Sequence, residues 1–293
     1  MAFYDFIYTG TQGEGSLQSR MTAPLEFGLT YQKGAHLLNM GFSYRGNQDI
    51  PYYYSRNEEA DFSIHPWTVN MGWKYQLETT ISTEEWEEKG IDQYIKKKYG
   101  EANVLSGFSL AIGPSASFVL GNSEWNSKKP FLNQHSGMGV FLDLGLGYYY
   151  EPWDAHINLA FRQNSTQQTA FDFSQTITRR SSTLEVYKFL FDYHGFVPFI
   201  GVNWSFEQLG LKESDSRNDF QYQAETSLWT PGITFGWDIR PNEVQTWILR
   251  TNLRYIPLRW NLDDGRQLTL DQLEFNIIQM VWYPSRWFTL RKL

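Results

Sequence analysis

The chain has 293 residues, of which 17% are aromatic and 19% are charged; it carries a net charge of −7 and has no cysteine. The lack of cysteine excludes disulfides, thiolate metal sites and cysteine nucleophiles, and the negative charge argues against a nucleic-acid partner, because no basic stripe is available to neutralise phosphates. No apolar run approaches the roughly 18 residues that a membrane-spanning helix requires, although the many aromatic and few charged residues are unusual for a cytosolic enzyme.

Alternation of apolar and polar residues is the dominant pattern along the chain, and residues 67–78 show it most clearly. Trp67, Val69, Met71 and the apolar residues that follow at every second position alternate with polar or small residues. A period of two indicates a strand with one apolar and one polar face, and about 9–11 residues suffice for a tilted strand to cross a bilayer. The same pattern predicts twelve strands, at about residues 3–9, 25–32, 38–45, 67–78, 108–118, 139–148, 154–164, 183–194, 197–208, 229–240, 244–256 and 268–282.

The connections between these predicted strands alternate between short and long. Tight turns are expected at Lys33-Gly34, at residues 151–154, at His194-Gly195 and at residues 240–243. Short turns on one side of a sheet and long loops on the other are typical of outer-membrane β-barrels, and an even strand number places both termini on the short-turn, periplasmic side. The longer polar loops are expected at about residues 10–22, 47–62, 121–137, 165–181, 210–227 and 257–267.

One connection departs from this rule, because residues 81–103 have the pattern of a helix. Ser82 and Glu85 form a capping box, acidic residues lie early and lysines late, which complements the helix dipole, and Gly100 is a suitable C-terminal stop. We expect residues 82–99 to form a periplasmic helix that docks a partner, with a lid under the barrel or a helix resting on the inner leaflet as alternatives. The candidate partner-binding residues are Trp86, Ile91, Tyr94, Ile95 and Tyr99.

The chain as a whole resembles the broad class of bacterial outer-membrane β-barrel proteins, through its architecture and without a narrower family motif. The resemblance implies an all-β fold: a transmembrane antiparallel up-and-down barrel of about twelve strands, forming a single domain over residues 1–293. A soluble β-sandwich or a lipocalin-like binding barrel would show the same alternation, with the apolar face turned inward. Long strands, tryptophan and tyrosine towards the strand ends, and polar faces rich in glycine and serine favour the membrane.

The polar faces of the predicted strands carry charges of both signs, which the alternation places in the barrel lumen. A strongly selective pore would carry a surplus of one sign, so the near balance suggests an internal salt-bridge network, with a narrow charge-lined path as the alternative. The residues expected in the lumen are Glu26, Arg45, Lys74, Glu78, Asp143, Arg162, Lys188, Asp192, Glu207, Asp238, Arg250, Arg254 and Glu274.

The histidines give no metal-binding motif by their spacing, and we expect neither a metal nor a cofactor. His135 is followed by Ser136 in a predicted external loop, and a Ser/His pair at the rim is the arrangement that outer-membrane lipid hydrolases use. Adjacent residues on an extended chain point in opposite directions, however, and cannot easily hydrogen bond. We therefore expect no enzyme and keep a lipid hydrolase as the alternative.

A predicted loop also carries three consecutive tyrosines, Tyr52 to Tyr54, followed by Glu58, Glu59 and Asp61. Exposed tyrosines suit protein or sugar contacts, and acidic groups suit the divalent cations that bridge lipopolysaccharide. The expected partners are therefore membrane lipids and lipopolysaccharide, together with envelope proteins that bind the helix.

The sequence thus predicts an integral, non-enzymatic barrel of the bacterial outer membrane. Two roles agree with it: a barrel subunit of an envelope assembly, or a narrow transport channel. No signal peptide is visible at the start of the sequence, and the expectation is that one has been removed.

Overall fold

The computed structural model describes residues 2–10, 13–15, 18–22, 24–46, 48–76, 105–121, 123–133, 137–193, 195–240 and 245–286. The chain divides into two compact units. The first comprises residues 1–89 with the short segments 131–133 and 169–171, and the second comprises the remainder.

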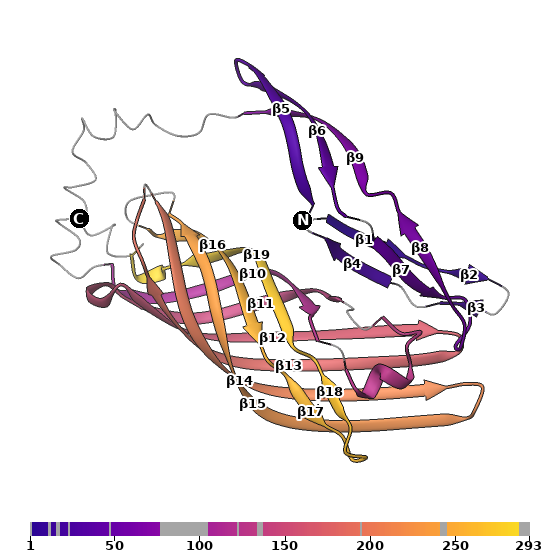
Figure 1. The fold of residues 1–293 in the computed structure, drawn as a ribbon. Coiled ribbons are helices and arrows are strands. Elements are labelled where there is room, and N and C mark those ends of the chain that lie inside the picture. Colours follow the sequence, from indigo (N-terminus) through magenta and orange to yellow (C-terminus); the bar gives the residue numbers. More distant parts are fainter. Residues whose placement is uncertain are drawn as a thin grey trace. The chain divides into compact units, whose positions relative to one another are not determined.

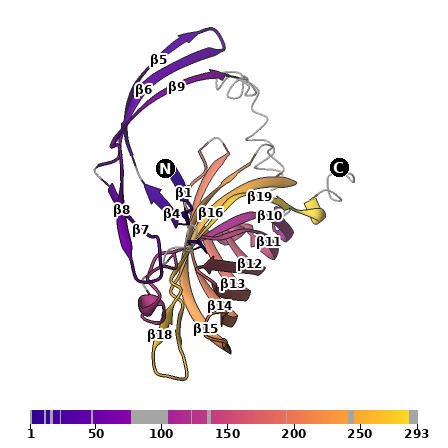
Figure 2. The same ribbon diagram turned by 90° about the vertical axis from the view of Figure 1, so that its right-hand side faces the viewer.

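The second unit is built around a closed antiparallel barrel of eight strands (Figures 1 and 2). Each barrel strand pairs with the next barrel strand along the chain, and β10 pairs with both β11 and β19, which closes the sheet. Closure leaves the sheet without an edge, so that backbone groups are hydrogen-bonded within it. The strands are β10 (Gly107–Val119), β11 (Gly137–Tyr150), β12 (Ala155–Ala170), β13 (Phe173–Phe189), β14 (Phe196–Asp215), β15 (Phe220–Ile239), β16 (Trp247–Ile256) and β19 (Gln272–Trp282).

Short connections join the barrel strands at one end. Between β11 and β12 the chain makes a 3-10 turn, η2 (Glu151–Trp153), and leaves it through Asp154 in the left-handed conformation, with φ of 46°. Between β13 and β14, Gly195 has φ of 83°, a value that suits glycine because it lacks a Cβ atom. At the opposite end, the β12–β13 hairpin turns through Phe171 and Asp172, both with positive φ, as a two-residue type I′ turn requires.

The second unit also contains a small hairpin, β17 (Arg259–Asn261) with β18 (Gln267–Thr269), and a 3-10 helix, η1 (Trp125–Lys128). Both lie in the connections at the end of the barrel opposite the short turns.

The first unit consists of separate small sheets. The largest is an antiparallel sheet of three strands, β5 (Leu25–Lys33), β6 (His36–Tyr44) and β9 (Trp67–Tyr75). The others are pairs: β1 (Ala2–Phe6) with β4 (Gln18–Thr22), β2 (Thr9–Gly10) with β3 (Gly13–Glu14), and β7 (Gln48–Tyr53) with β8 (Glu59–Ile64).

The predicted count of twelve barrel strands is wrong: within the described residues the closed barrel has eight. The last eight predicted strand regions form it, in the predicted order, whereas the first four lie in the first unit. The physical reason is that a period of two reports a strand with two different faces, and it does not report which sheet the strand joins.

Two predicted loops are also largely strand. Residues 165–181 belong mostly to β12 and β13, and residues 210–227 belong mostly to β14 and β15. The outward positions there, such as Ser165 and Gln167, are polar, so the contrast between the two faces disappears although the hydrogen-bonded ladder continues. The predicted loops at 10–22, 47–62 and 257–267 also contain short strands.

The predicted helix at 82–99 lies outside the described residues, and so do Trp86, Ile91, Tyr94, Ile95 and Tyr99. Where the chain is described, none of its helices has the length and apolar character needed to cross a membrane.

Candidate functional site: the barrel interior

The barrel is apolar on its outside and polar at the centre of its inside. On β11, Leu142, Leu144 and Leu146 point outward and are about half exposed, whereas Asp143 between them is fully buried. On β14, Val202 and Trp204 are exposed and Asn203 is buried. Soluble barrels bury their apolar face, so this inverted arrangement identifies the outer surface as lipid-facing.

Aromatic side chains mark both borders of this apolar band. At the short-turn end the rings of Phe196 and Trp237 lie 6.3 Å apart, and at the far end those of Phe206 and Trp229 lie 5.0 Å apart. Measured along the barrel axis, the two borders lie roughly 25 Å apart at the usual rise and tilt of barrel strands, which is the height of the apolar band in outer-membrane barrels. Beyond Phe206 the strands project out of the band.

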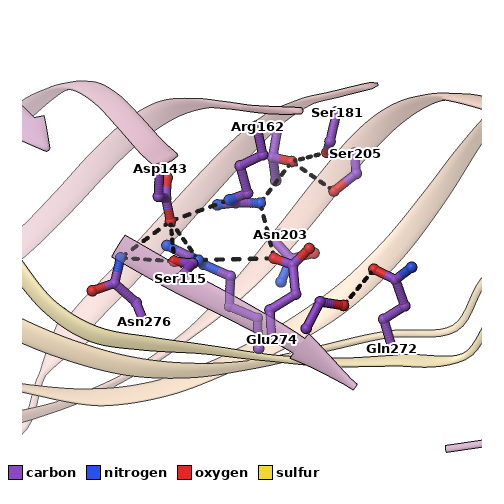
Figure 3. A network of polar contacts seen from close by, with 12 residues as sticks. Ser115, Asp143, Arg162, Ser181, Asn203, Ser205, Gln272, Glu274 and Asn276 are labelled. Atoms are coloured by element: carbon purple, nitrogen blue, oxygen red, sulfur yellow. Dashed lines mark hydrogen bonds and ion pairs between the residues drawn. The ribbon is translucent and has the colours of Figure 1, made fainter. Parts of the chain in front are cut away.

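Inside the band, charged side chains from five strands meet in a network (Figure 3). Arg254 on β16 contacts Asp143 on β11 (Nη1–Oδ2, 2.7 Å) and Glu185 on β13 (Nε–Oε1, 2.9 Å). Arg162 on β12 contacts the same two carboxylates and lies 3.5 Å from Glu274 on β19 (Nη1–Oε2). All five side chains are at most 1% exposed.

The network continues towards the far end through Arg179 on β13. Its guanidinium donates two parallel hydrogen bonds to Glu207, both of 2.7 Å, the fork arrangement that makes an arginine–carboxylate pair directional. Arg179 also bonds to Glu274, and Ser181 donates to Glu207 at 2.9 Å. Hydrogen bonds to neutral side chains surround the charges: Asn276 donates to Ser115 at 3.0 Å.

A second buried ion pair lies nearer the short-turn end. Arg250 donates to both oxygens of Asp238, at 2.7 and 2.9 Å. Its guanidinium also lies 5.2 Å from the ring centres of Tyr187 and Phe199. These rings belong to a buried apolar cluster, the inner plug, formed by Leu105, Ala111, Tyr149, Tyr187, Phe189, Val197, Phe199, Ile248, Val281 and Tyr283.

A second apolar cluster, the outer plug, lies at the far end of the barrel. Trp125 of η1 is part of it, and its indole Nε1 donates to Glu213 at 2.8 Å. Lys129 bonds to the same carboxylate at 2.6 Å; burial lowers the pKa of this ammonium, and Glu213 opposes the shift. The cluster comprises Val119, Trp125, Ile177, Leu209, Leu211, Leu258, Trp260, Leu262, Leu268 and Leu270.

Most of the charges that the sequence places in the lumen and that lie on barrel strands are buried inside the barrel. They are Asp143, Arg162, Glu207, Asp238, Arg250, Arg254 and Glu274.

Two predicted lumen residues are placed wrongly. Lys188 is exposed on the outer face of β13 and donates to the carbonyl of Trp153, and Asp192 lies in the exposed turn that follows, where it accepts from the Gly195 amide at 2.8 Å. The inward positions of β13 are the odd-numbered ones. Both faces of this strand carry apolar side chains at 184–189, and the alternation therefore gave the wrong face.

Three other predicted lumen residues, Glu26, Arg45 and Lys74, belong to the first unit and not to the barrel. Glu78 lies outside the described residues.

Glu185 and Arg179 are the central residues that the sequence pattern missed. Arg179 stands in a segment that was expected to be a loop, and Glu185 stands on the face that was expected to be outward. Reading the alternation backward from Glu185 through Thr183, Ser181 and Arg179 would have found both, because all four side chains are buried on one face.

Inside the barrel, a serine–histidine contact joins Ser109 Oγ and His156 Nε2 at 2.9 Å. Both residues are buried, and His156 stacks on Tyr187, so the pair belongs to the packed interior. His135 and Ser136, the pair that the sequence suggested, lie outside the described residues. Within the described ranges, no group of three or more histidine, aspartate or glutamate side chains is placed to hold a metal ion.

No protein-family model matches the chain, and no curated protein matches it. Solved structures do resemble it, each over 61% of this chain and 97% of its own length. They include the attachment invasion locus protein Ail of Yersinia pestis (12% identity, TM-score 0.39), Neisserial surface protein A (10%, 0.44) and the outer membrane protein OprG of Pseudomonas aeruginosa (13%, 0.44).

The geometry of the barrel itself defines its class. It is closed, antiparallel and even-stranded, apolar towards its surroundings and polar within, with aromatic borders about one hydrocarbon thickness apart. These are the features of a bacterial outer-membrane β-barrel. The chain is therefore an integral protein of the bacterial outer membrane.

Proposed function

We propose that the barrel is a closed, non-enzymatic anchor that serves as a subunit of an envelope assembly, rather than an open channel. The observation that carries this proposal is the layer of buried ion pairs across the lumen, whose side chains are at most 1% exposed. The inner plug covers the layer on one side and the outer plug on the other.

The energetics of the layer oppose conduction. A solute that crosses the lumen has to separate arginines from carboxylates that are already paired. Breaking a buried ion pair and leaving one partner uncompensated costs about 3–5 kcal/mol, and Arg162 and Arg254 each contact more than one carboxylate. The layer therefore holds the barrel wall together from inside.

The parts of the strands that extend beyond the lipid band support a role as a scaffold that presents binding surfaces to other envelope components. Past Trp229 the outward positions of β15 are polar, with Ser227, Glu225 and Gln223 exposed. The β14–β15 hairpin therefore continues as a paired ladder into water, held by the same strands that anchor the barrel. A filled barrel that carries rigid projecting hairpins suits a scaffold for other envelope components.

The narrow channel is the second candidate, and one feature favours it. The charged layer is lined with small polar groups, such as Ser115, Ser205 and Asn276, which water could solvate if the ion pairs rearranged. We also propose lipopolysaccharide, and proteins that bind the predicted helix at 82–99, as partners.

Solute uptake by proteoliposomes tests the choice. Vesicles that contain the folded full chain should swell in arabinose no faster than protein-free vesicles. The matched comparison is the double variant Arg162→Ala with Arg254→Ala, which removes both central guanidinium groups. Its folding is checked by its heat-modifiable migration in gels. Rapid swelling with the unmodified protein would favour the channel.

A further inference from the structure

The three-stranded sheet of the first unit has one face made of large apolar side chains, and they are exposed. Register pairs Leu29 with Met40 and Met40 with Met71, so these three side chains form a row across the sheet. Leu29 is 83% exposed and Met71 79%. The other large apolar or aromatic residues of this face are Leu25, Phe27, Tyr31, Leu38, Phe42, Tyr44, Trp67, Val69, Trp73 and Tyr75, and Lys33 and His36 share the end row with Tyr75.

The rows of this face are ordered by chemistry. The central row holds leucine and methionine, and the next holds Phe27, Phe42 and Val69. Tryptophan and tyrosine stand at both ends: the rings of Tyr44 and Trp67 lie 4.7 Å apart at one end, and Tyr31, Trp73 and Tyr75 stand at the other. At the usual rise and tilt of barrel strands, β9 spans roughly 20 Å along the membrane normal.

The opposite face of the same sheet is mainly polar, with Leu37 as its apolar exception and with Glu26 and Lys74 as its charged residues. Thr30 donates to Asn39 at 2.8 Å, Asn70 bonds to Ser43, and Gly28 and Gly41 are register partners. The sheet therefore repeats the chemistry of the barrel wall, with aliphatic and phenylalanine side chains on one face, tryptophan and tyrosine at both borders of that face, and mainly polar groups on the other face.

We propose that the apolar face of β5, β6 and β9 contacts the acyl chains of a lipid bilayer, with the strands crossing the hydrocarbon layer. A contiguous apolar face of this size is not left in water. The order of the rows selects lipid as the occupant, because tryptophan and tyrosine favour the two membrane–water interfaces and aliphatic side chains favour the layer between them.

The proposal has a consequence for the two outer strands. Open sheet edges do not occur in the hydrocarbon region, because unpaired backbone groups are costly there. The amides along the outer edges of β5 and β9 are therefore expected to be paired in the membrane, and hydrogen exchange in vesicles should find them protected.

Spin labels can test the proposal, because the chain has no cysteine to remove. Single cysteines at each position from 69 to 73 would be nitroxide-labelled in the full chain, in phosphatidylcholine vesicles. Labels at Val69, Met71 and Trp73 should collide frequently with oxygen, which partitions into lipid, and rarely with a water-soluble nickel chelate. Labels at Asn70 and Gly72 should lack this preference.

The control is Leu144→Cys on the lipid-facing side of β11, which reports whether the barrel itself is inserted. With that control lipid-exposed, an oxygen preference at Met71 at least several-fold above that at Asn70 supports the proposal. Nickel access at Met71 would mean that the face is in water, and exclusion of both reagents would mean that protein covers it. Either result overturns the proposal and leaves the function proposed for the barrel unaffected.

Discussion

Arg254 Nη1 lies 2.7 Å from Asp143 Oδ2, although β16 and β11 are not neighbours in the sheet. The ion pair therefore spans the lumen, and it ties together two parts of the wall that no backbone hydrogen bond joins. Contacts of this kind stabilise the fold, so the barrel interior has a structural role in addition to being the candidate functional site.

The Arg254→Met variant should lower the free energy of unfolding by about 3–5 kcal/mol, because it leaves Asp143 and Glu185 buried with one fewer cation. Equilibrium urea unfolding in lipid vesicles measures this change. Lys188→Met is the matched control: Lys188 is exposed on the outside of β13, and removing it should change stability much less. Equal effects of the two substitutions would contradict the cross-lumen network.

The pair of Arg250 and Asp238 should respond differently to single and double changes. Asp238→Leu alone leaves the Arg250 guanidinium without its carboxylate and should cost about 3–5 kcal/mol, whereas Asp238→Leu with Arg250→Met replaces the pair by apolar groups and should cost less. A double-mutant cycle of unfolding free energies measures the coupling. Strictly additive effects would show that the two side chains do not interact.

The cost in stability of a cation on the lipid-facing surface should depend on its depth in the membrane. Leu144→Arg puts a cation on the outside of β11 inside the apolar band and should cost about 2–4 kcal/mol, whereas Gln167→Arg, farther along the outward face of β12 and past Ser165, should cost about 0–1 kcal/mol. Both residues are on the outer face, so side-chain orientation is matched. Unfolding in vesicles gives the two values, and a reversed order would place the band elsewhere.

Lys129 should give the outer plug a pH dependence. Burial lowers the pKa of Lys129 below that of an unfolded lysine, so between the two pKa values the unfolded chain binds more protons and stability rises with pH. Lys129→Arg keeps the positive charge and removes this titration. The stability of the unmodified protein relative to the variant should therefore grow as the pH is raised through the alkaline range, and unfolding curves at several pH values measure it. A difference that stays constant would show that Lys129 does not titrate with folding.

The order of the barrel strands followed from the sequence, whereas several of their ends and their number did not. Leu144 in the barrel and Met71 in the first unit stand in the same alternation, and only the pairing of β10 with β19 shows where the barrel closes. Closure is decided by contacts between residues far apart in the chain, and a local pattern does not contain them.

The charged interior was partly predictable for a related reason. Asp143 and Arg254 stand alone among small or apolar neighbours, and alternation assigns their face directly. Leu184 and Val186 lie on the outward face of β13, and Tyr187 lies on the inward face together with Glu185. Because both faces carry apolar side chains here, hydrophobicity does not separate inside from outside. Inner aromatic side chains are what make the interior of this barrel unlike a simple polar lumen.

Single-channel recording in a planar bilayer tests the central claim most directly. The purified full chain, with folding verified by its heat-modifiable migration, is added to the bilayer in concentrated potassium chloride while voltages of both signs are applied. A barrel closed by its ion pairs and its two plugs should insert without discrete, reproducible conductance steps. Steps of constant size from the folded, unmodified protein would contradict the account and establish an open path through the lumen.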